Sequence, residues 1–181
     1  MGESKLFVAI LSAIIGFALS ILKPTIDEYL SSRKLKKAVK CEIDWLLKCS
    51  ENGIACLREN LAGGEQLVAH FPKPMKSYVI SENMKDVTSL YLGENEKLGC
   101  IRNFFSNMEM FNNAASLYYS GNPTVRPESA FLAYQALIMM RNNLKKFKSP
   151  YFEPSNANVE KDAEVLSFFH KLSIAAARSR L

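Results

Sequence analysis

Residues 6–22 read LFVAILSAIIGFALSIL and contain no charged side chain. A helix that is apolar on every side must be covered on every side, which is difficult in a small water-soluble domain. At about 1.5 Å per residue, seventeen helical residues cover about 26 Å, against a hydrocarbon thickness of about 30 Å. The segment therefore predicts a transmembrane helix, and we assign residues 1–24 to a membrane anchor.

Two other interpretations of this segment are a cleaved secretory signal and a buried core helix. ALS at 18–20 is a passable cleavage site. Cleavage there would, however, send the basic stretch RKLKKAVK at 33–40 across the membrane, and positive charge close behind an apolar segment resists translocation. The charge pattern thus favours an uncleaved, single-pass span.

A cluster of basic residues follows the predicted span. It has five basic side chains and no acidic one, whereas the chain from Cys49 onward is nearly neutral. By the positive-inside rule the amino terminus is expected outside and the long carboxyl-terminal part in the cytosol, most typically at a bacterial inner membrane. The cluster can act as a topology determinant or can contact anionic lipid headgroups. Nucleic acid is not an expected partner, because no aromatic residue is interleaved with the cluster. Its members are Arg33, Lys34, Lys36, Lys37 and Lys40.

Small residues recur on one side of the predicted span. At about 100° per residue they fall on one face of a helix, where backbones of two spans can approach closely. This pattern predicts self-association into a homodimer or higher oligomer, although a monomeric anchor with an incidental pattern is an alternative. The residues of this small-residue face are Ala9, Ser12, Ala13, Gly16 and Ser20.

Beyond the span the apolar residues repeat every three or four positions, which is typical of helices. Residues 25–62 are expected to form a long juxtamembrane helix that restarts near Pro24 and ends at Gly63–Gly64. Residues 63–181 are expected to form a cytosolic bundle of about four helices plus a short one. The predicted fold is all-α. Within 63–181 the expected helices are 82–92, 95–119, one that opens at Pro127, and 159–178. Ser81 is expected to cap the first of them, and Phe105 is expected in the buried stripe of the second.

No motif of a catalytic or cofactor-binding site is present, so we predict neither cofactor nor metal. The glycines form no phosphate-binding loop, and neither H-E-x-x-H nor E-x-x-H occurs. His70 and His170 are interpreted as structural. The cysteines lack zinc-ligand spacing and are expected to be buried, reduced thiols. These cysteines are Cys41, Cys49, Cys56 and Cys100.

The features together favour a membrane-anchored, non-enzymatic interaction or adaptor module whose partners are membrane lipid and another protein. The layout is similar to that of many small bacterial single-pass proteins, without any shared motif. Two alternatives stay open. One is an oligomeric effector that perturbs the membrane, as in toxin or anti-phage systems, and the other is a membrane-bound enzyme with an unrecognised site.

Overall fold

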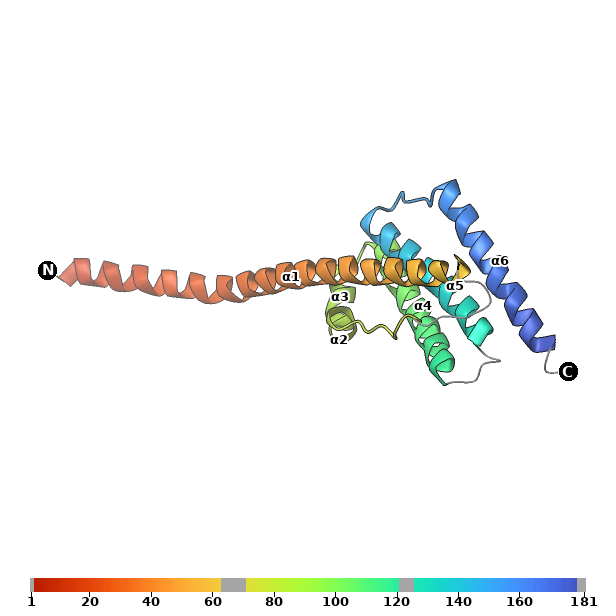
Figure 1. Cartoon of the computed structure of the whole chain (residues 1–181). Coiled ribbons are helices and arrows are strands. Elements are labelled where there is room, and N and C mark those ends of the chain that lie inside the picture. Colours follow the sequence, from red (N-terminus) through yellow and green to blue (C-terminus); the bar gives the residue numbers. More distant parts are fainter. Residues whose placement is uncertain (1, 63–70, 121–125, 179–181) are drawn as a thin grey trace. The chain divides into compact units, whose positions relative to one another are not determined.

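The computed structural model describes the backbone of residues 2–62, 71–120 and 126–178, and side chains from residue 16 onward within these ranges except 18 and 60–62. Every regular element in these ranges is a helix (Figure 1). The all-α prediction is therefore confirmed. The helices are α1 (Gly2–Ala62), α2 (Val79–Glu82), α3 (Met84–Leu90), α4 (Asn95–Tyr119), α5 (Arg126–Lys148) and α6 (Asn156–Arg178).

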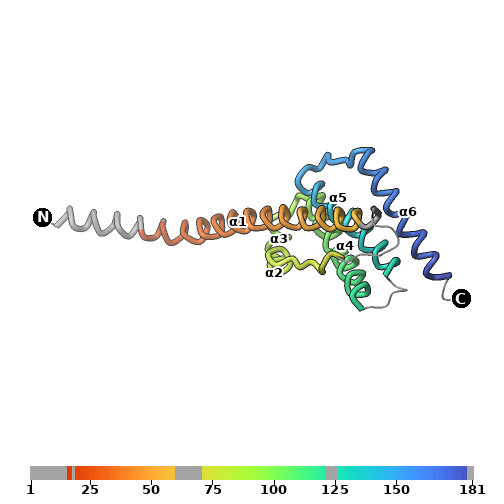
Figure 2. Tube along the Cα trace, viewed as in Figure 1, coloured from red at the N-terminus to blue at the C-terminus, as the bar shows by residue number. Residues whose placement is uncertain are grey.

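The chain divides into two compact units, residues 1–40 and 41–181. Figure 2 traces the Cα path, coloured by residue number. The first unit is helical from Gly2 and contains Pro24 inside the helix. The expected restart at Pro24 is wrong, since the helix continues through it. Pro24 has no N–H to donate to the Ser20 carbonyl oxygen, so the helix continues with one backbone donor fewer at this turn.

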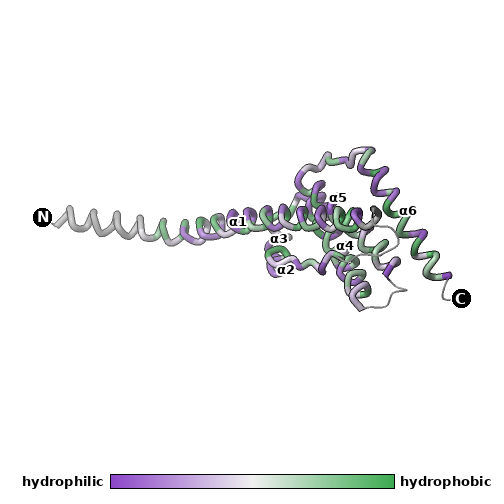
Figure 3. The backbone as a smooth tube through the Cα atoms, in the orientation of Figure 1, coloured by the Kyte–Doolittle hydropathy of each residue, from purple (hydrophilic) through white to green (hydrophobic). Residues whose placement is uncertain are grey.

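Among the residues whose side chains are described, no helix is long and apolar enough to cross a membrane. Most of the predicted span, residues 6–15 and 18, lies outside those residues. The transmembrane assignment therefore stays a prediction. Figure 3 shows hydropathy along the remainder of the chain, where apolar and polar residues alternate along each helix.

The second unit is a bundle built around α5. Helix α4 runs alongside α5, and α6 packs on α5 as well (Figure 1). The part of α1 that belongs to this unit also contacts α5. An added Cβ at Gly53 would lie 3.0 Å from Leu137 Cδ1, so the missing side chain lets the two helices approach closely. Alanines at 130, 133 and 136 of α5 are fully buried, and their small side chains let neighbouring elements pack closely on α5.

The boundaries of the long helices agree well with the sequence periodicity. Helix α4 covers the predicted 95–119, α5 opens next to Pro127, and α6 begins three residues before the predicted start. The buried stripe of α4 is rotated from the prediction. Phe104 is 1% exposed, whereas Phe105 is half-buried. The expectation that Phe105 lies in the core is therefore wrong.

The predicted helix over 82–92 is also wrong in its start. Two short helices, α2 and α3, replace it, and Ser81 lies inside α2 rather than capping it. The cause is Glu42, a buried carboxylate on α1. Its Oε1 accepts the N–H groups of Tyr78 and Val79 at 2.5 and 3.0 Å, and its Oε2 accepts that of Ile80 at 2.7 Å. This carboxylate satisfies the first amides of α2 from another element, so the helix can begin without a local cap.

Glu42→Ala is expected to lower the free energy of unfolding by about 1–3 kcal/mol, because it leaves buried backbone donors without an acceptor. Urea denaturation of the full chain in mild detergent, followed by circular dichroism, measures the change. Glu109→Ala, at an exposed position of α4, is the matched control and should stay within about 0.5 kcal/mol of the original chain. Equal midpoints for both variants would show that Glu42 does not stabilise the start of α2.

Candidate functional site

The five basic residues predicted to follow the span are all exposed on α1. Arg33, Lys36, Lys37 and Lys40 fall within about 100° of the helix circumference, and Lys34 lies to one side. Helix α1 is unbroken from Leu22 to Lys40, which puts Lys40 about 27 Å further along the axis than Leu22. In a helix that is upright in a bilayer, even Arg33 would lie about 16 Å beyond Leu22, which is more than a Debye length of about 8–10 Å, so contact of the cluster with lipid headgroups stays a prediction.

The predicted small-residue face is described only in part. Gly16 and Ser20 are exposed, and an added Cβ at Gly16 would meet no atom within 4 Å. Ala9, Ser12 and Ala13 lie outside the residues whose side chains are described. The two described members are one helical turn apart on an open surface, and self-association through this face stays a prediction.

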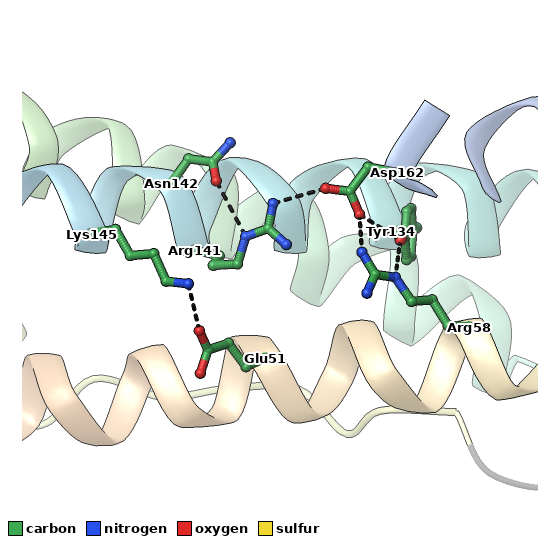
Figure 4. A network of polar contacts seen from close by, with 7 residues as sticks. All are labelled: Glu51, Arg58, Tyr134, Arg141, Asn142, Lys145 and Asp162. Atoms are coloured by element: carbon green, nitrogen blue, oxygen red, sulfur yellow. Dashed lines mark hydrogen bonds and ion pairs between the residues drawn. The ribbon is translucent and has the colours of Figure 1, made fainter. Parts of the chain in front are cut away.

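A polar network that the sequence analysis missed joins α1, α5 and α6 (Figure 4). Asp162 of α6 accepts the Arg58 Nη2–H at 2.5 Å and the Tyr134 hydroxyl at 2.8 Å on Oδ1. Its Oδ2 accepts the Arg141 Nη2–H at 2.8 Å. Arg58 also donates from Nε to the Tyr134 oxygen at 2.9 Å. Both carboxylate oxygens are thus occupied by side chains from two neighbouring helices.

The electrostatics of this network favour the charged carboxylate. Burial alone would raise the pKa of Asp162, but the hydrogen bonds from Arg141, Arg58 and Tyr134 outweigh burial and lower it. The pKa of Tyr134 is raised to about 12, first by burial and then by its hydrogen bond to Asp162, so the phenol stays protonated. Neither group is poised to exchange protons near neutral pH, and the network is suited to holding α6 on the bundle rather than to acid–base catalysis.

One signal in the sequence pointed to this network. Asp162 lies three and seven residues before Val165 and Phe169, the other two buried residues of α6. A carboxylate in register with an apolar stripe requires a buried partner. Its partners Arg58 and Arg141 are 104 and 21 residues away in the chain, and helix periodicity alone does not reveal that pairing.

An open groove of about 660 Å³ lies between α1 and the segment that precedes α2. Trp45, Cys49 and Cys56 line it from α1, and Met75 and Tyr78 line it from the other side. Trp45 is 47% exposed and Tyr78 is 58% exposed. Two large aromatic side chains therefore border one hollow and are only partly covered by the fold.

The segment that forms the second wall has no regular structure but is held along its length. The Tyr119 hydroxyl donates to the Phe71 carbonyl oxygen at 2.5 Å. Asn112 bonds both backbone groups of Met75, accepting its N–H at 2.8 Å and donating to its carbonyl oxygen at 2.9 Å. Glu42 holds the end of the segment as described above. The wall is thus preformed by contacts from α1 and α4, which reduces the entropy lost when a ligand binds.

The one described histidine and the four cysteines do not come together in a second site. His170 is exposed on α6, and His70 lies outside the described residues. Cys41 is exposed and the other three thiols are partly buried, so the expectation of buried cysteines is wrong. Burial raises the pKa of Cys49 and of Cys56, which keeps both thiols neutral. Across the described residues, no group of three or more histidine, cysteine or carboxylate side chains could hold a metal ion.

No protein-family model, no curated protein and no solved structure matches this chain.

Proposed function

We propose that this chain is a single-pass membrane protein whose helical bundle binds another protein, as a non-enzymatic interaction or adaptor module. The uncharged segment 6–22 carries the membrane part of the proposal. Its backbone is helical, and the apolar side chains described at its end and just after it are exposed. Such exposure is costly in water and is favourable in lipid. These residues are Phe17, Leu19, Ile21, Leu22 and Ile26, each more than half exposed.

The interaction part of the proposal is supported by the second unit. Its described polar chemistry is used to join helices, as in the Asp162 network, while a preformed groove with exposed aromatic residues is left uncovered. Aromatic side chains at the rim of a groove are typical anchors of protein interfaces. The basic cluster on α1 then sets the orientation, with the bundle on the cytosolic side.

We expect the full chain to stay in the membrane fraction after a carbonate wash and the bundle to be degraded by protease added to sealed inside-out vesicles. The reason is that a charge-free helical segment partitions into hydrocarbon and the basic cluster resists translocation. Immunoblotting of the washed membranes and of the protease-treated vesicles measures both. Release by carbonate would contradict the anchor, and a protected bundle would contradict the orientation.

The alternative of an oligomeric, membrane-perturbing effector is favoured by one observation, the open surface at Gly16 and Ser20. If this face mediates association, Gly16→Ile should weaken the signal of a reporter assay for span association, because the bulky side chain separates the two backbones. Ile15→Leu is the control and should leave the signal unchanged. Equal signals from both variants would remove the support for this alternative, as would overproduction that leaves the membrane potential intact.

A further inference from the structure

We infer that the groove between α1 and residues 72–78 is a docking site for a protein segment that combines apolar side chains with acidic ones. The inference rests on the proposed interaction function and names where the partner binds and by what chemistry. Three properties of the groove carry it: its apolar lining, the sign of its charge and its preformed wall.

The lining of the groove is mostly apolar. Pro72, Pro74 and Met75 form much of one wall, and the neutral thiols of Cys49 and Cys56 contribute on α1. The volume of about 660 Å³ is that of a site that buries several side chains of a ligand. An apolar anchor inserted between Trp45 and Tyr78 would cover the surface that the fold leaves exposed.

The charge of the groove has one sign. Lys73 and Lys76 are the charged residues of its lining, and both are exposed. Neither forms an ion pair with a residue in the described part of the chain, whereas Lys145 and Lys148 of α5 each pair with a carboxylate of α1. A partner that supplies carboxylates at the rim therefore complements the groove, and a basic partner is repelled.

The spacing of charge and aromatic groups favours a peptide over a nucleic acid. A strand of nucleic acid needs a row of cations that follows its phosphates, together with stacking platforms. Here Trp45 and Tyr78 can serve as stacking platforms, but two lysines do not form a row of cations. Most other side chains of the lining are those of proline, methionine and cysteine. These groups match aliphatic and aromatic side chains of a peptide better than they match sugars and phosphates.

Selection of random twelve-residue peptides on phage tests the inference. The full chain is presented in nanodiscs of phosphatidylethanolamine and phosphatidylglycerol. If the carbonate wash releases the chain from membranes, it is presented in buffer instead. Peptide binding is thereby tested whether or not the membrane anchor is confirmed. Trp45 is the one tryptophan of the chain, so its emission reports directly on the groove. Enriched peptides should contain both acidic and apolar residues, and their synthetic, tryptophan-free forms should shift this emission.

Charge reversal supplies the matched comparison. Lys73→Glu with Lys76→Glu should weaken binding of the enriched peptides about tenfold and should strengthen binding of the same peptides with lysine in place of each acidic residue. The control, Lys85→Glu with Lys161→Glu, reverses two exposed lysines outside the groove and should change neither affinity. If the peptides bind the Lys73→Glu, Lys76→Glu variant as tightly as the original chain, the inference is overturned. The peptides would then bind elsewhere on the chain, and the proposed interaction function would stand.

Three further outcomes would also overturn it. They are peptides enriched without acidic residues, no enrichment above that on empty nanodiscs, and tighter binding of a fifteen-nucleotide oligo(dT) than of any peptide. A circular dichroism spectrum of each variant that matches the original chain shows that lost binding is not lost folding.

Discussion

Asp162→Ala is expected to lower the free energy of unfolding by about 3–5 kcal/mol, because it removes the carboxylate that neutralises a buried arginine. The Arg141 side chain is 8% exposed and its Nη2 donates to Asp162. Without that carboxylate the guanidinium is charged and buried without a counterion. Arg58, 29% exposed, can turn toward water and loses less. Denaturation of the full chain in mild detergent, followed by circular dichroism, measures the difference.

Asp44→Ala is the matched control for this substitution. Asp44 pairs with Lys148 of α5 at 2.6 Å, but the two side chains are 59% and 50% exposed. A pair so open to water contributes about 0–1 kcal/mol. A double variant, Asp162→Ala with Arg141→Met, should recover part of the loss, because it removes the more buried of the two arginine charges and leaves only the partly exposed Arg58 without its carboxylate. If Asp162→Ala and Asp44→Ala lower the free energy of unfolding equally, the buried network does not stabilise the bundle more than an exposed ion pair does.

Asp162 should also make the free energy of unfolding depend on pH. The folded state lowers the pKa of Asp162 below its ordinary value, so the carboxylate stabilises the fold at pH values above about 4. This contribution is lost as the pH falls through the lowered pKa of the folded state. The stability difference between the original chain and Asp162→Ala should accordingly be constant near neutral pH and should shrink below about pH 4. A difference that grows in acid would contradict the assigned direction.

Phe104→Ala is expected to cost about 3–5 kcal/mol, through the lost burial of a phenyl ring and the cavity that it leaves. Phe104 is 1% exposed, and its ring meets the ring of Phe105 edge-on at 5.5 Å between centroids. The neighbouring substitution Phe105→Ala provides the comparison, since it deletes the same atoms from a half-buried position. It should cost less than about 2 kcal/mol. The same denaturation measurement gives both stability losses. A loss for Phe105→Ala that equals or exceeds the loss for Phe104→Ala would contradict the rotation of the α4 stripe.

Helix boundaries proved predictable where local chemistry decides them. Helix α4 begins and ends as the periodicity indicates, and α5 opens beside Pro127, where a missing N–H costs nothing. The start of α2 was not predictable in this way. Its amides are satisfied by Glu42, 36 to 38 residues earlier, and no local pattern announces an acceptor from another element.

The choice between Phe104 and Phe105 shows a second limit of sequence patterns. Both residues fit a helical repeat of apolar positions, and adjacent positions differ by about 100° around the axis. Helix α4 must face α5, which decides the rotation, and this requires tertiary information. The sequence did not reveal the groove for a similar reason, because its two walls, residues 45–56 and 72–78, belong to separate segments of the chain.

The small buried surface of helix α6 determines which part of the second unit unfolds first. Its buried residues are Asp162, Val165 and Phe169, all in its first two thirds, whereas α5 is buried along its whole length. An element with so small a buried patch can detach while the rest of the bundle stays folded. The amides of α6 would then exchange with deuterated solvent through this partial opening, and acid that protonates Asp162 would make the opening more frequent before the remaining helices separate.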